Sequence, residues 1–395
     1  MGSTGSIGCS ALDVIRWANE AGEDTFEVVA LTAGSNAAKL AAQALEFRPQ
    51  VAVIADEAQL AELQARLAGS GIEAAGGNTA VVEAAARPAG RVLAAIVGAA
   101  GLESTLAAVR AGNDVAIANK ESVVCGGRLI LEEAEKAGVN VLPVDSEHSA
   151  IHQCLANGRA LERLTITASG GPFRTATLEQ MRVASPTAAA AHPNWDMGIK
   201  NSIDSATLMN KALEFIEAAY LFDVAPEMID VIIHPQSIIH GMAHFTDGSV
   251  IAQLGAPDMR TPISYALGWP DRVPTRVARL DLVQLGKLDF EPVDAAKFPA
   301  IELAREAITA GPGATTVLNC ANESAVSAFI AGQCGFLDIS WLVKEVLNRF
   351  LSGNMAGVRC SSLEEIGLLD RYARTATEDV LKRAPVGGAE GRTLG

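Results

Sequence analysis

The sequence lacks any C-x-x-C pair, and its six cysteines are scattered along the chain. This distribution argues against a disulfide framework or a zinc site and favours reduced thiols in a cytoplasm. No apolar run reaches the length of a transmembrane helix, and no signal peptide precedes the first motif. We therefore expect a soluble, cytoplasmic protein.

Positive charge is also scarce. The chain has 31 Lys and Arg against 46 Asp and Glu, which gives a net charge of -15. This balance argues against nucleic acid and anionic membranes as partners. An anionic substrate would need a local group of cations, backbone N–H groups or a metal ion to overcome the surrounding field.

What is present is a long chain of 395 residues, which indicates two or three domains. Residues 1–145 alternate β-branched runs with Ala- and Leu-rich helical patterns, which predicts a parallel, doubly wound α/β sheet of the Rossmann type. Strands are predicted at 26–32, 51–54, 92–97, 114–118 and 139–144, and helices at 37–45 and 58–67.

The rest of the chain predicts a different organisation. Residues 146–285 are expected to form an α+β catalytic domain, and residues 286–384 a linker and a C-terminal helical bundle, followed by a disordered tail at 385–395. Strands are predicted at 164–168, 231–233 and 250–254, and helices at 206–222, 300–310, 315–331, 339–351 and 362–381.

The glycine-rich segment Gly2-Ser3-Thr4-Gly5-Ser6-Ile7-Gly8 leads directly into an amphipathic helix. Glycines at this spacing let the backbone approach a pyrophosphate, whose charge then lies at a helix N-terminus. A flexible terminus is the alternative, but the strand–helix alternation that follows favours a dinucleotide site. The fingerprint should follow a buried strand, and only Met1 precedes it. Either the true start lies upstream or the cofactor site is damaged, and the intact downstream pattern favours an upstream start.

The second predicted strand ends at Leu31-Thr32-Ala33-Gly34-Ser35-Asn36, where no Asp or Glu is placed to bind a ribose 2′-hydroxyl. The absence of that acid permits a 2′-phosphate, so NADP is favoured over NAD. A plain loop is the alternative interpretation of these residues.

Asp145-Ser146-Glu147 follows a predicted buried strand, at the carboxyl end where ligands of open α/β sheets gather. Two carboxylates one residue apart in a turn can face one hard divalent cation, with Ser146 free to hold a substrate oxygen. Lys120, in Asn119-Lys120-Glu121, also follows a strand and is expected beside the same crevice. A solvated acidic turn and a surface lysine are the alternatives.

Two loops are candidates for substrate contacts. Ser169-Gly170-Gly171-Pro172 exposes backbone N–H groups beside a hydroxyl, which suits an anion nest, although a tight turn is the alternative. The segment His192-Pro193-Asn194-Trp195-Asp196-Met197-Gly198 is interpreted as a lid that folds over a ligand, although its Trp could instead be fixed in the core.

A helix is expected to begin near Ser205, with Asp204 and Ser205 at the N-cap. Asn210, Lys211 and Glu214 would then lie on neighbouring parts of one face. A Lys–Glu pair at this spacing is usually a surface ion pair, but the nearby Asn and Ser suit phosphate recognition. Carboxylates at Asp145, Glu147 and Glu214 would suit Mg²⁺ or Mn²⁺, whereas the histidines favour packing roles over ligation.

Taken together, these motifs resemble the 1-deoxy-D-xylulose 5-phosphate reductoisomerase family over nearly the whole chain, in order. The matching segments are residues 2–8, 118–122, 144–148, 169–173, 192–198, 204–207, 210–211, 234–237, 257–262 and 319–323. The resemblance implies a homodimeric enzyme of non-mevalonate isoprenoid synthesis. It would convert 1-deoxy-D-xylulose 5-phosphate to 2-C-methyl-D-erythritol 4-phosphate with NADPH and a divalent cation (Mg²⁺, Mn²⁺ or Co²⁺).

The resemblance also implies a role for each matching residue. The cation would be held by Asp145, Glu147 and Glu214, and the substrate phosphate by Ser169, Ser205, Asn210 and Lys211. Lys120 and Ser146 would contact the substrate, and His192 and Trp195 would close above it. NADPH would be contacted by Thr4, Gly5, Ser6, Ile7, Gly34, Ser35, Asn36, Asn119, Glu121 and Gly198.

Two departures from the family pattern matter. No strand precedes Gly2, and Ser35 stands where some members carry a lysine that could bind the 2′-phosphate. Two other functions compete with the family assignment: an NADP-dependent semialdehyde or sugar-phosphate dehydrogenase without rearrangement, and a non-catalytic protein that binds a sugar phosphate.

Overall fold

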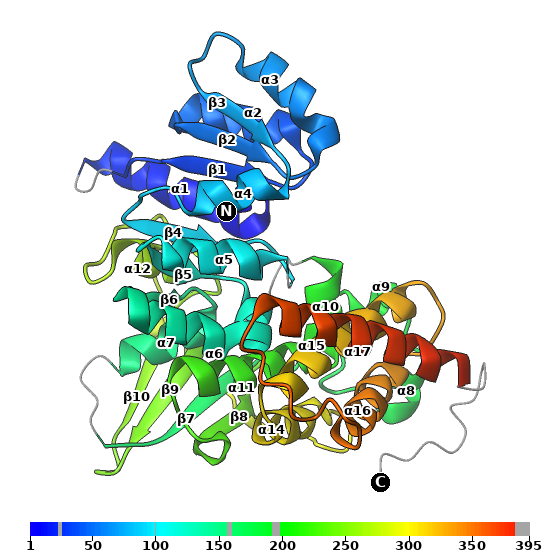
Figure 1. The fold of residues 1–395 in the computed structure, drawn as a ribbon. Helices are drawn as coiled ribbons and strands as arrows, with labels where there is room; N and C mark the ends of the chain where they lie inside the picture. Colours follow the sequence, from blue (N-terminus) through cyan, green and yellow to red (C-terminus); the bar gives the residue numbers. More distant parts are fainter. Residues whose placement is uncertain (23–25, 99, 156–159, 192–197, 384–395) are drawn as a thin grey trace. The chain divides into compact units, whose positions relative to one another are not determined.

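The computed structural model describes residues 1–22, 26–98, 100–155, 160–191 and 198–383 (Figure 1). The chain forms two compact units that are interleaved along the sequence. The first unit contains Met1–Ser122, Ile130–His152 and Asp258–Arg279, and the second contains Val123–Leu129, Gln153–Pro257 and Leu280–Gly395. The expected division into three sequence-continuous domains therefore stays a prediction.

The first unit is built on parallel strands, as the sequence predicts. The strands β1 (Ala30–Ala33), β2 (Val51–Ile54) and β3 (Glu73–Gly76) form one sheet in the order β1-β2-β3. The strands β4 (Arg91–Ala94), β5 (Asp114–Ile117) and β6 (Val141–Pro143) form another in the order β4-β5-β6. All pairings are parallel. All four residues of β2 are buried, which explains its continuous apolar run.

Helices connect and cover these strands (Figure 1). Asn36 caps α2 by accepting a hydrogen bond from the Lys39 amide at 2.9 Å, which ends β1 and begins the helix within three residues. The helices that lie wholly or partly in the first unit are α1 (Ser6–Ala21), α2 (Ala37–Phe47), η1 (Glu57–Gln59), α3 (Leu60–Leu67), α4 (Asn78–Ala85), α5 (Gly101–Arg110), α6 (Lys120–Ala137), α7 (Ser146–Cys154) and α12 (Arg260–Gly268).

The bounds of two strands in the first unit differ from the prediction. The segment predicted as a strand over 26–32 is a strand only from Ala30, and the one predicted over 92–97 ends at Ala94. Strand β3 was not predicted, because its sequence Glu-Ala-Ala-Gly contains no β-branched or aromatic residue. Its pairing with β2 supplies the regularity that its own residues lack.

Met1–Ser3 lies between the two sheets of the first unit. The Met1 amino group donates to the Leu93 carbonyl at 2.8 Å, and the Ser3 amide donates to the Thr32 carbonyl at 2.7 Å. In doubly wound sheets of order 3-2-1-4-5-6, this is the position of the first strand. Among the described residues, no strand lies between β1 and β4.

The second unit carries a mixed sheet in the order β10-β9-β7-β8-β11. Strands β7 and β8 are parallel, and the other pairings are antiparallel. Strand β9 was not predicted, since its glycine and two histidines obscure the pattern. The strands are β7 (Leu161–Ala168), β8 (Ile229–Ile233), β9 (Ile239–Phe245), β10 (Val250–Leu254) and β11 (Glu291–Pro292), and the helices are α8 (Leu178–Arg182), α9 (Pro186–Ala189), α10 (Ile199–Ala206), α11 (Met209–Leu221), η2 (Pro226–Met228) and α13 (Leu282–Leu285).

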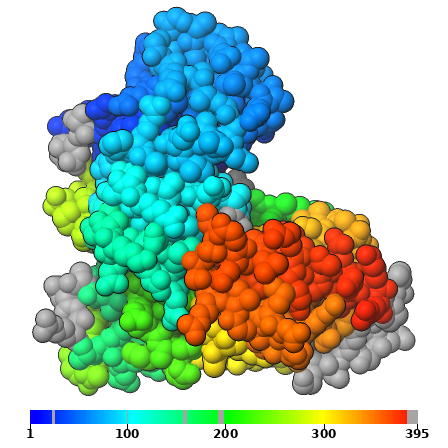
Figure 2. All heavy atoms as spheres, viewed as in Figure 1, coloured from blue at the N-terminus to red at the C-terminus, as the bar shows by residue number. Residues whose placement is uncertain are grey.

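The C-terminal part of the second unit is the predicted helical bundle. Helix α15 is its centre and packs against the other three, and most of its residues are buried. The bundle contains α14 (Ala300–Ala310), α15 (Pro312–Ile330), α16 (Asp338–Leu351) and α17 (Leu363–Arg383). Figure 2 shows α16 and α17 as a continuous orange-to-red surface. Residues 385–395, predicted as a disordered tail, lie outside the described residues.

Within the described ranges, every helix is too short or too polar to cross a membrane.

Candidate active site

The glycine-rich loop has the close backbone packing that its glycines predict. Gly2 has φ +77°, and a Cβ there would lie 2.7 Å from the Ala95 carbonyl oxygen. A Cβ at Gly8 would lie 2.4 Å from the Gly2 carbonyl oxygen. Both positions therefore require glycine, because a side chain would push the loop away from β4 or from the start of α1.

Helix α1 begins at Ser6 with Gly5 as its N-cap, and no side chain caps it. Thr4, Gly5, Ser6 and Ile7 are exposed or half-buried. The first N–H groups of a helix have no partner within the helix and carry its positive dipole end. This uncapped, accessible N-terminus can therefore receive a phosphate group.

The carboxyl end of β1 supplies a second part of this site. Gly34, Ser35 and Asn36 are exposed, and none of them is acidic. Lys39 lies in the first turn of α2, and its ammonium group donates to the Thr4 carbonyl at 2.9 Å. The sequence analysis missed Lys39, because only the fold brings residue 39 beside residue 4. Lys39 lies four residues after Ser35, about one helical turn further along the chain. This spacing is the signal in the sequence that could have identified it.

Asn119 connects the carboxyl ends of β4 and β5. It is 3% exposed. Its side-chain amide donates to the Gly98 carbonyl at 2.8 Å, and its oxygen accepts from the Ser122 amide at 3.2 Å, which caps α6. The side chain thus holds the loop after β4 in place, and Lys120 and the buried Glu121 follow it in the first turn of α6.

The expectation of a turn at Asp145-Ser146-Glu147 is wrong in part. Ser146 and Glu147 form the first turn of α7, and the Asp145 carbonyl accepts from the Ser149 amide at 2.8 Å. An acidic residue directly before a helix is favoured there, because its carboxylate meets free N–H groups. The Ser146 amide accordingly donates to Asp145 Oδ1 at 2.9 Å.

Both carboxylates of this triplet have partners within the protein. Lys120 forms an ion pair with Asp145, and the Ser146 hydroxyl donates to the Glu147 carboxylate. The Asp145 and Lys120 side chains are only 13% and 15% exposed. A lysine thus balances a largely buried carboxylate at the carboxyl end of β6, where the sequence analysis expected both residues.

The Ser169-Gly170-Gly171 loop ends β7 in the second unit. Gly170 and Gly171 have φ +83° and +63°, and the Gly171 amide donates to the Ser169 hydroxyl at 3.2 Å. A Cβ at Gly171 would lie 2.7 Å from the Ser205 carbonyl oxygen. The fold therefore brings Ser169 and Ser205, both predicted phosphate ligands, onto adjoining backbone segments.

The expectation that Asp204 and Ser205 cap a helix is wrong. Helix α10 begins at Ile199, so both residues lie in its last turn, and α11 begins only at Met209. The sequence shows a cap-like pair, but α10 has its N-cap at Gly198 and already runs through both positions. Asp204 is instead buried and accepts from Lys200 at 3.0 Å and from the Asn322 amide at 2.8 Å.

Helix α11 brings three of the predicted ligands into contact. Glu214 accepts from Asn210 at 2.6 Å and from Lys211 at 2.5 Å, so the shared helix face was predicted correctly. The Lys211 and Glu214 side chains are 5% and 1% exposed. This buried ion pair contradicts the alternative of a solvated surface pair.

Several histidines form hydrogen bonds within the protein. His234 Nδ1 lies 2.8 Å from the Asp289 carbonyl oxygen, while its Nε2 accepts from the Ile238 amide. His152 lies 2.7 Å from the Tyr265 hydroxyl and His244 lies 2.8 Å from the Thr165 hydroxyl. Burial, with a contribution from the nearby Lys211 charge, lowers the pKa of His240 to about 4. His240 is therefore neutral beside Lys211.

The predicted lid cannot be placed. His192 and Trp195, with the rest of residues 192–197, lie outside the described residues. Gly198 is described, and it is the exposed N-cap of α10.

The parallel sheets, the glycine-rich loop at a helix N-terminus and the polar strand ends define a doubly wound α/β protein of the dinucleotide-binding class. Family models identify the particular kind. One described as 1-deoxy-D-xylulose 5-phosphate reductoisomerase matches residues 1–127. Two models of C-terminal domains from reductoisomerases of the same kind match residues 141–222 and 254–376.

Individual relatives agree over almost the full length. The 1-deoxy-D-xylulose 5-phosphate reductoisomerase of Rhodospirillum centenum is 52% identical over 96% of this chain and 93% of its own. That of Rhodopseudomonas palustris strain BisB18 is 53% identical with the same coverage. The chain therefore belongs to the 1-deoxy-D-xylulose 5-phosphate reductoisomerase family.

Solved structures match equally well. The Zymomonas mobilis reductoisomerase in complex with NADPH has a TM-score of 0.90 at 45% identity, covering 97% of this chain and 98% of its own. A DOX-P reductoisomerase in complex with NADPH, fosmidomycin and magnesium has a TM-score of 0.89 at 42% identity, covering 96% and 97%.

Proposed function

We propose that this chain converts 1-deoxy-D-xylulose 5-phosphate to 2-C-methyl-D-erythritol 4-phosphate, using NADPH and a divalent cation, in non-mevalonate isoprenoid synthesis. The observation that carries the proposal is the match to reductoisomerases over 96% of the chain. Structures of similar proteins with NADPH and with magnesium support the cofactors. The local geometry of the matching motifs supports their assignment to this reaction.

For NADPH, we propose contacts along the carboxyl ends of β1, β4 and β5. The uncapped N-terminus of α1 would bind the pyrophosphate, and the exposed loop after β1 would bind the adenosine 2′-phosphate beside Lys39. The bound cofactor would supply a hydride to the substrate. The proposed contact residues are Thr4, Gly5, Ser6, Ile7, Gly34, Ser35, Asn36, Asn119, Glu121 and Gly198, with Lys39 added.

For the cation, we propose Asp145, Glu147 and Glu214 as ligands. Carboxylate oxygens suit Mg²⁺, Mn²⁺ or Co²⁺. Asp145 and Glu214 are largely buried, and each carboxylate forms an ion pair with a lysine. Positive charge therefore already balances both carboxylates, and a bound cation would take over that role. A bound cation would polarise the substrate carbonyl as a Lewis acid. Lys120 and Lys211 would then be released to meet substrate oxygens.

For the phosphate, we propose Ser169, Ser205, Asn210 and Lys211. Phosphate oxygens accept hydrogen bonds, and these residues offer two hydroxyls, an amide and an ammonium group as donors. The Gly170-Gly171 backbone brings the first hydroxyl beside the last turn of α10. Because His240 is neutral, the positive charge for the phosphate would come from Lys211. Binding the phosphate remotely would orient the carbon skeleton for the reaction.

The remaining proposed contacts orient the substrate and exclude water. Lys120 and Ser146 would contact the oxygens of the carbon chain, next to Asp145 and Glu147. His192 and Trp195 would close above the substrate, as the resemblance implies. Exclusion of water would protect the rearranged aldehyde until it is reduced.

The decisive experiment follows NADPH absorbance with the deoxyxylulose phosphate and Mn²⁺. We expect oxidation that depends on both, and a loss of at least about 100-fold in kcat for Glu214→Gln, which removes one charge without changing shape. A semialdehyde dehydrogenase would keep most of its rate in Glu214→Gln. A protein that binds the sugar phosphate but oxidises no NADPH would support the non-catalytic alternative.

We also propose a cytoplasmic homodimer. All six cysteines are free thiols, which supports a reducing compartment. The dimer rests on the family resemblance, and light scattering during size-exclusion chromatography tests it. A monomeric mass at micromolar concentration would contradict it.

A further inference from the structure

A two-residue turn joins α10 to α11 in the second unit (Figure 1). It consists of Thr207 and Leu208, which separate the last residue of α10 from the first residue of α11. We call these two residues the α10–α11 turn. The proposed phosphate ligand Ser205 precedes the turn, and the proposed ligands Asn210 and Lys211 follow it.

A break between the two helices is needed if these three ligands are to share one phosphate. An uninterrupted α-helix turns by about 100° per residue. Ser205 would then lie about 140° from Asn210 and about 120° from Lys211 around the helix axis. Side chains at such angles do not face each other, because only residues three or four apart are neighbours on a helix surface. The geometry of the turn therefore decides whether the donors meet.

Leu208 gives the break its backbone geometry. Its φ is +59°, in the left-handed region that is costly for a residue with a Cβ. Such a conformation persists only where the surrounding structure holds it. The Leu208 side chain is buried in an apolar cluster that also contains Ile203 of α10 and Phe329 of α15. Burial of the side chain thus holds the strained backbone in place.

The Thr207 hydroxyl connects the two sides of the turn. It shares its proton between the Ile203 and Asp204 carbonyls, both at 3.1 Å, and it accepts from the Met209 amide at 3.2 Å. Met209 is the first residue of α11, and the side chain of the N-cap residue, Leu208, cannot cap that helix. The buried hydroxyl therefore replaces the missing cap and ties the end of α10 to the start of α11.

Asn322 holds the end of α10 from outside the turn. Its side-chain amide, on α15, donates to Asp204 Oδ1 at 2.8 Å, and both residues are buried. Lys200 lies 3.0 Å from the other carboxylate oxygen and balances its charge. Asp204 directly precedes Ser205, so this contact fixes the last turn of α10 against the helical bundle.

We propose that Thr207 and Asn322 are positioning residues for the substrate phosphate. The Thr207 hydroxyl holds the α10–α11 turn in the geometry that brings Ser205 towards Asn210 and Lys211, and Asn322 fixes the last turn of α10. Both roles rest on the proposed function, which assigns these three ligands to the phosphate. Neither positioning side chain needs to touch the phosphate itself.

The first test uses Thr207→Val, which removes the hydroxyl and keeps nearly the same side-chain shape. We expect the KM for 1-deoxy-D-xylulose 5-phosphate to rise at least about tenfold, with a smaller fall in kcat, because the phosphate ligands are displaced while the reacting groups are not. The dissociation constant of inorganic phosphate, measured by isothermal titration calorimetry without NADPH, should rise by a similar factor. The affinity for NADPH should stay the same.

Thr377→Val is the matched control. Thr377 is also buried in the second unit, and its hydroxyl donates to the Ala373 carbonyl at 2.8 Å within α17. This variant loses a buried hydroxyl of the same kind, so its thermal midpoint should fall while its phosphate affinity stays unchanged. Thr207→Ser keeps the hydroxyl at the turn and should retain most of the phosphate affinity.

Asn322→Ala tests the second positioning residue. It removes the donor to Asp204 and leaves the hydrogen bonds of Thr207 intact. We expect the dissociation constant of inorganic phosphate to rise at least about threefold, because the end of α10 is then held less firmly. This variant also decides the matter if Thr207→Val does not fold, which circular dichroism verifies.

Unchanged phosphate affinity in folded Thr207→Val, or in Asn322→Ala if that variant alone folds, would overturn the proposal. Equal losses of phosphate affinity in Thr207→Val and Thr377→Val would also overturn it, as would equal losses in Thr207→Val and Thr207→Ser. Failure of the proposed function gives a different result. The unmodified protein would then bind inorganic phosphate without oxidising NADPH, and the phosphate affinities of the variants would still test both positioning residues.

Discussion

We propose that a single side chain, Lys39, sets the preference for NADPH over NADH. Ser35 carries no charge, so the loop after β1 has no cation of its own for a 2′-phosphate. Lys39 lies one helical turn further on, and its contact with the Thr4 carbonyl places an ammonium group at the glycine-rich loop. A charge-assisted hydrogen bond from this ammonium group to the 2′-phosphate would be worth about 1.5–3 kcal/mol.

Replacing Lys39 by Met should therefore weaken NADPH binding by about tenfold or more and leave NADH binding nearly unchanged. Fluorescence titration of both cofactors measures this difference. Lys39→Arg should retain the preference, and Lys136→Met, on the exposed end of α6, serves as the matched control. A similar loss for both cofactors would indicate that Lys39 only stabilises the loop.

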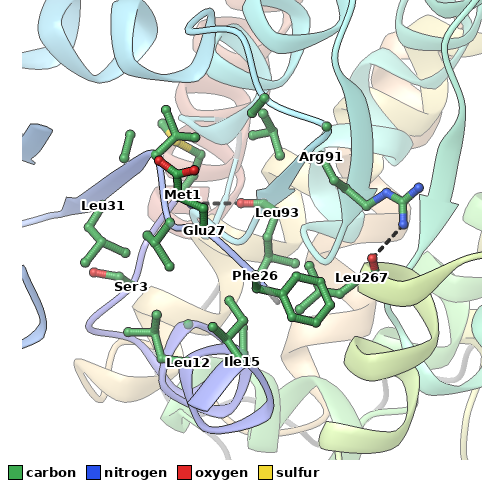
Figure 3. A pocket seen from close by; sticks show the side chains of 18 of the residues that line it. Met1, Ser3, Leu12, Ile15, Phe26, Glu27, Leu31, Arg91, Leu93 and Leu267 are labelled. Atoms are coloured by element: carbon green, nitrogen blue, oxygen red, sulfur yellow. Dashed lines mark hydrogen bonds between the residues drawn. The ribbon is translucent and has the colours of Figure 1, made fainter. Parts of the chain in front are cut away.

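In a protein whose N-terminus is Met1, the buried Met1 amino group (Figure 3) predicts a pH dependence of stability. Its pKa falls from 8.0 in the unfolded chain to about 6 in the folded protein because it is buried. The unfolded chain then binds the proton more tightly, so the free energy of unfolding should decrease by up to about 2–3 kcal/mol as the pH falls from 8 to 6.

Chemical denaturation at several pH values tests this dependence. His152 and His244 also have pKa values lowered by burial, so they contribute to the same pH dependence. Comparison with an Nα-acetylated protein isolates Met1, because acetylation removes only that charge. An identical pH profile for the two proteins would contradict the prediction.

At the scale of elements, loops at strand ends bring candidate ligands together. Gly171 allows the loop after β7 to approach the last turn of α10. Gly332, at the end of α15, has a similar positive φ of +71°, but nothing lies within 4 Å of where its Cβ would be. A substitution at either glycine would strain the backbone, but only one at Gly171 would also cause a steric clash. Comparing the two positions therefore distinguishes the two effects.

Gly171→Ala should raise the KM for the sugar phosphate at least about tenfold, because a Cβ would displace Ser205 or Ser169. Gly332→Ala should lower stability by only about 1–2 kcal/mol through its left-handed backbone and leave KM unchanged. Steady-state kinetics and thermal unfolding measure the two effects. Equal KM values in the two variants would argue against a role for this loop in phosphate binding.

A buried hydrogen bond also connects two helices, α10 and α15. Asp204 is buried and shared by Lys200 and Asn322. Asn322→Leu removes one donor and leaves the carboxylate partly unsatisfied, so we expect a loss of about 1–3 kcal/mol in unfolding free energy. Asn348→Leu, on α16, is a control within the same bundle. Similar losses in both variants would show that Asp204 does not depend on Asn322.

At the scale of the whole molecule, strongly apolar strands and well-spaced helices were predictable. Residues 51–54 and 250–254 form strands, and residues 300–310 a helix, with the predicted bounds. Strands β3 and β9 were missed, because neighbouring strands stabilise residues whose own propensities are weak. The assignment of Asp204 as a cap failed because α10 begins earlier, at Ile199, and already contains Asp204.

Local sequence patterns are sufficient to predict the glycine-rich loop, the parallel strands and the Lys211–Glu214 face of α11, because each depends on residues close together in the chain. Which distant residues meet depends instead on the tertiary fold. Sheet order places Met1 between Thr32 and Leu93, and helix packing places Asn322 against Asp204. Such contacts arise from strand order and burial across the whole unit, which no local pattern encodes.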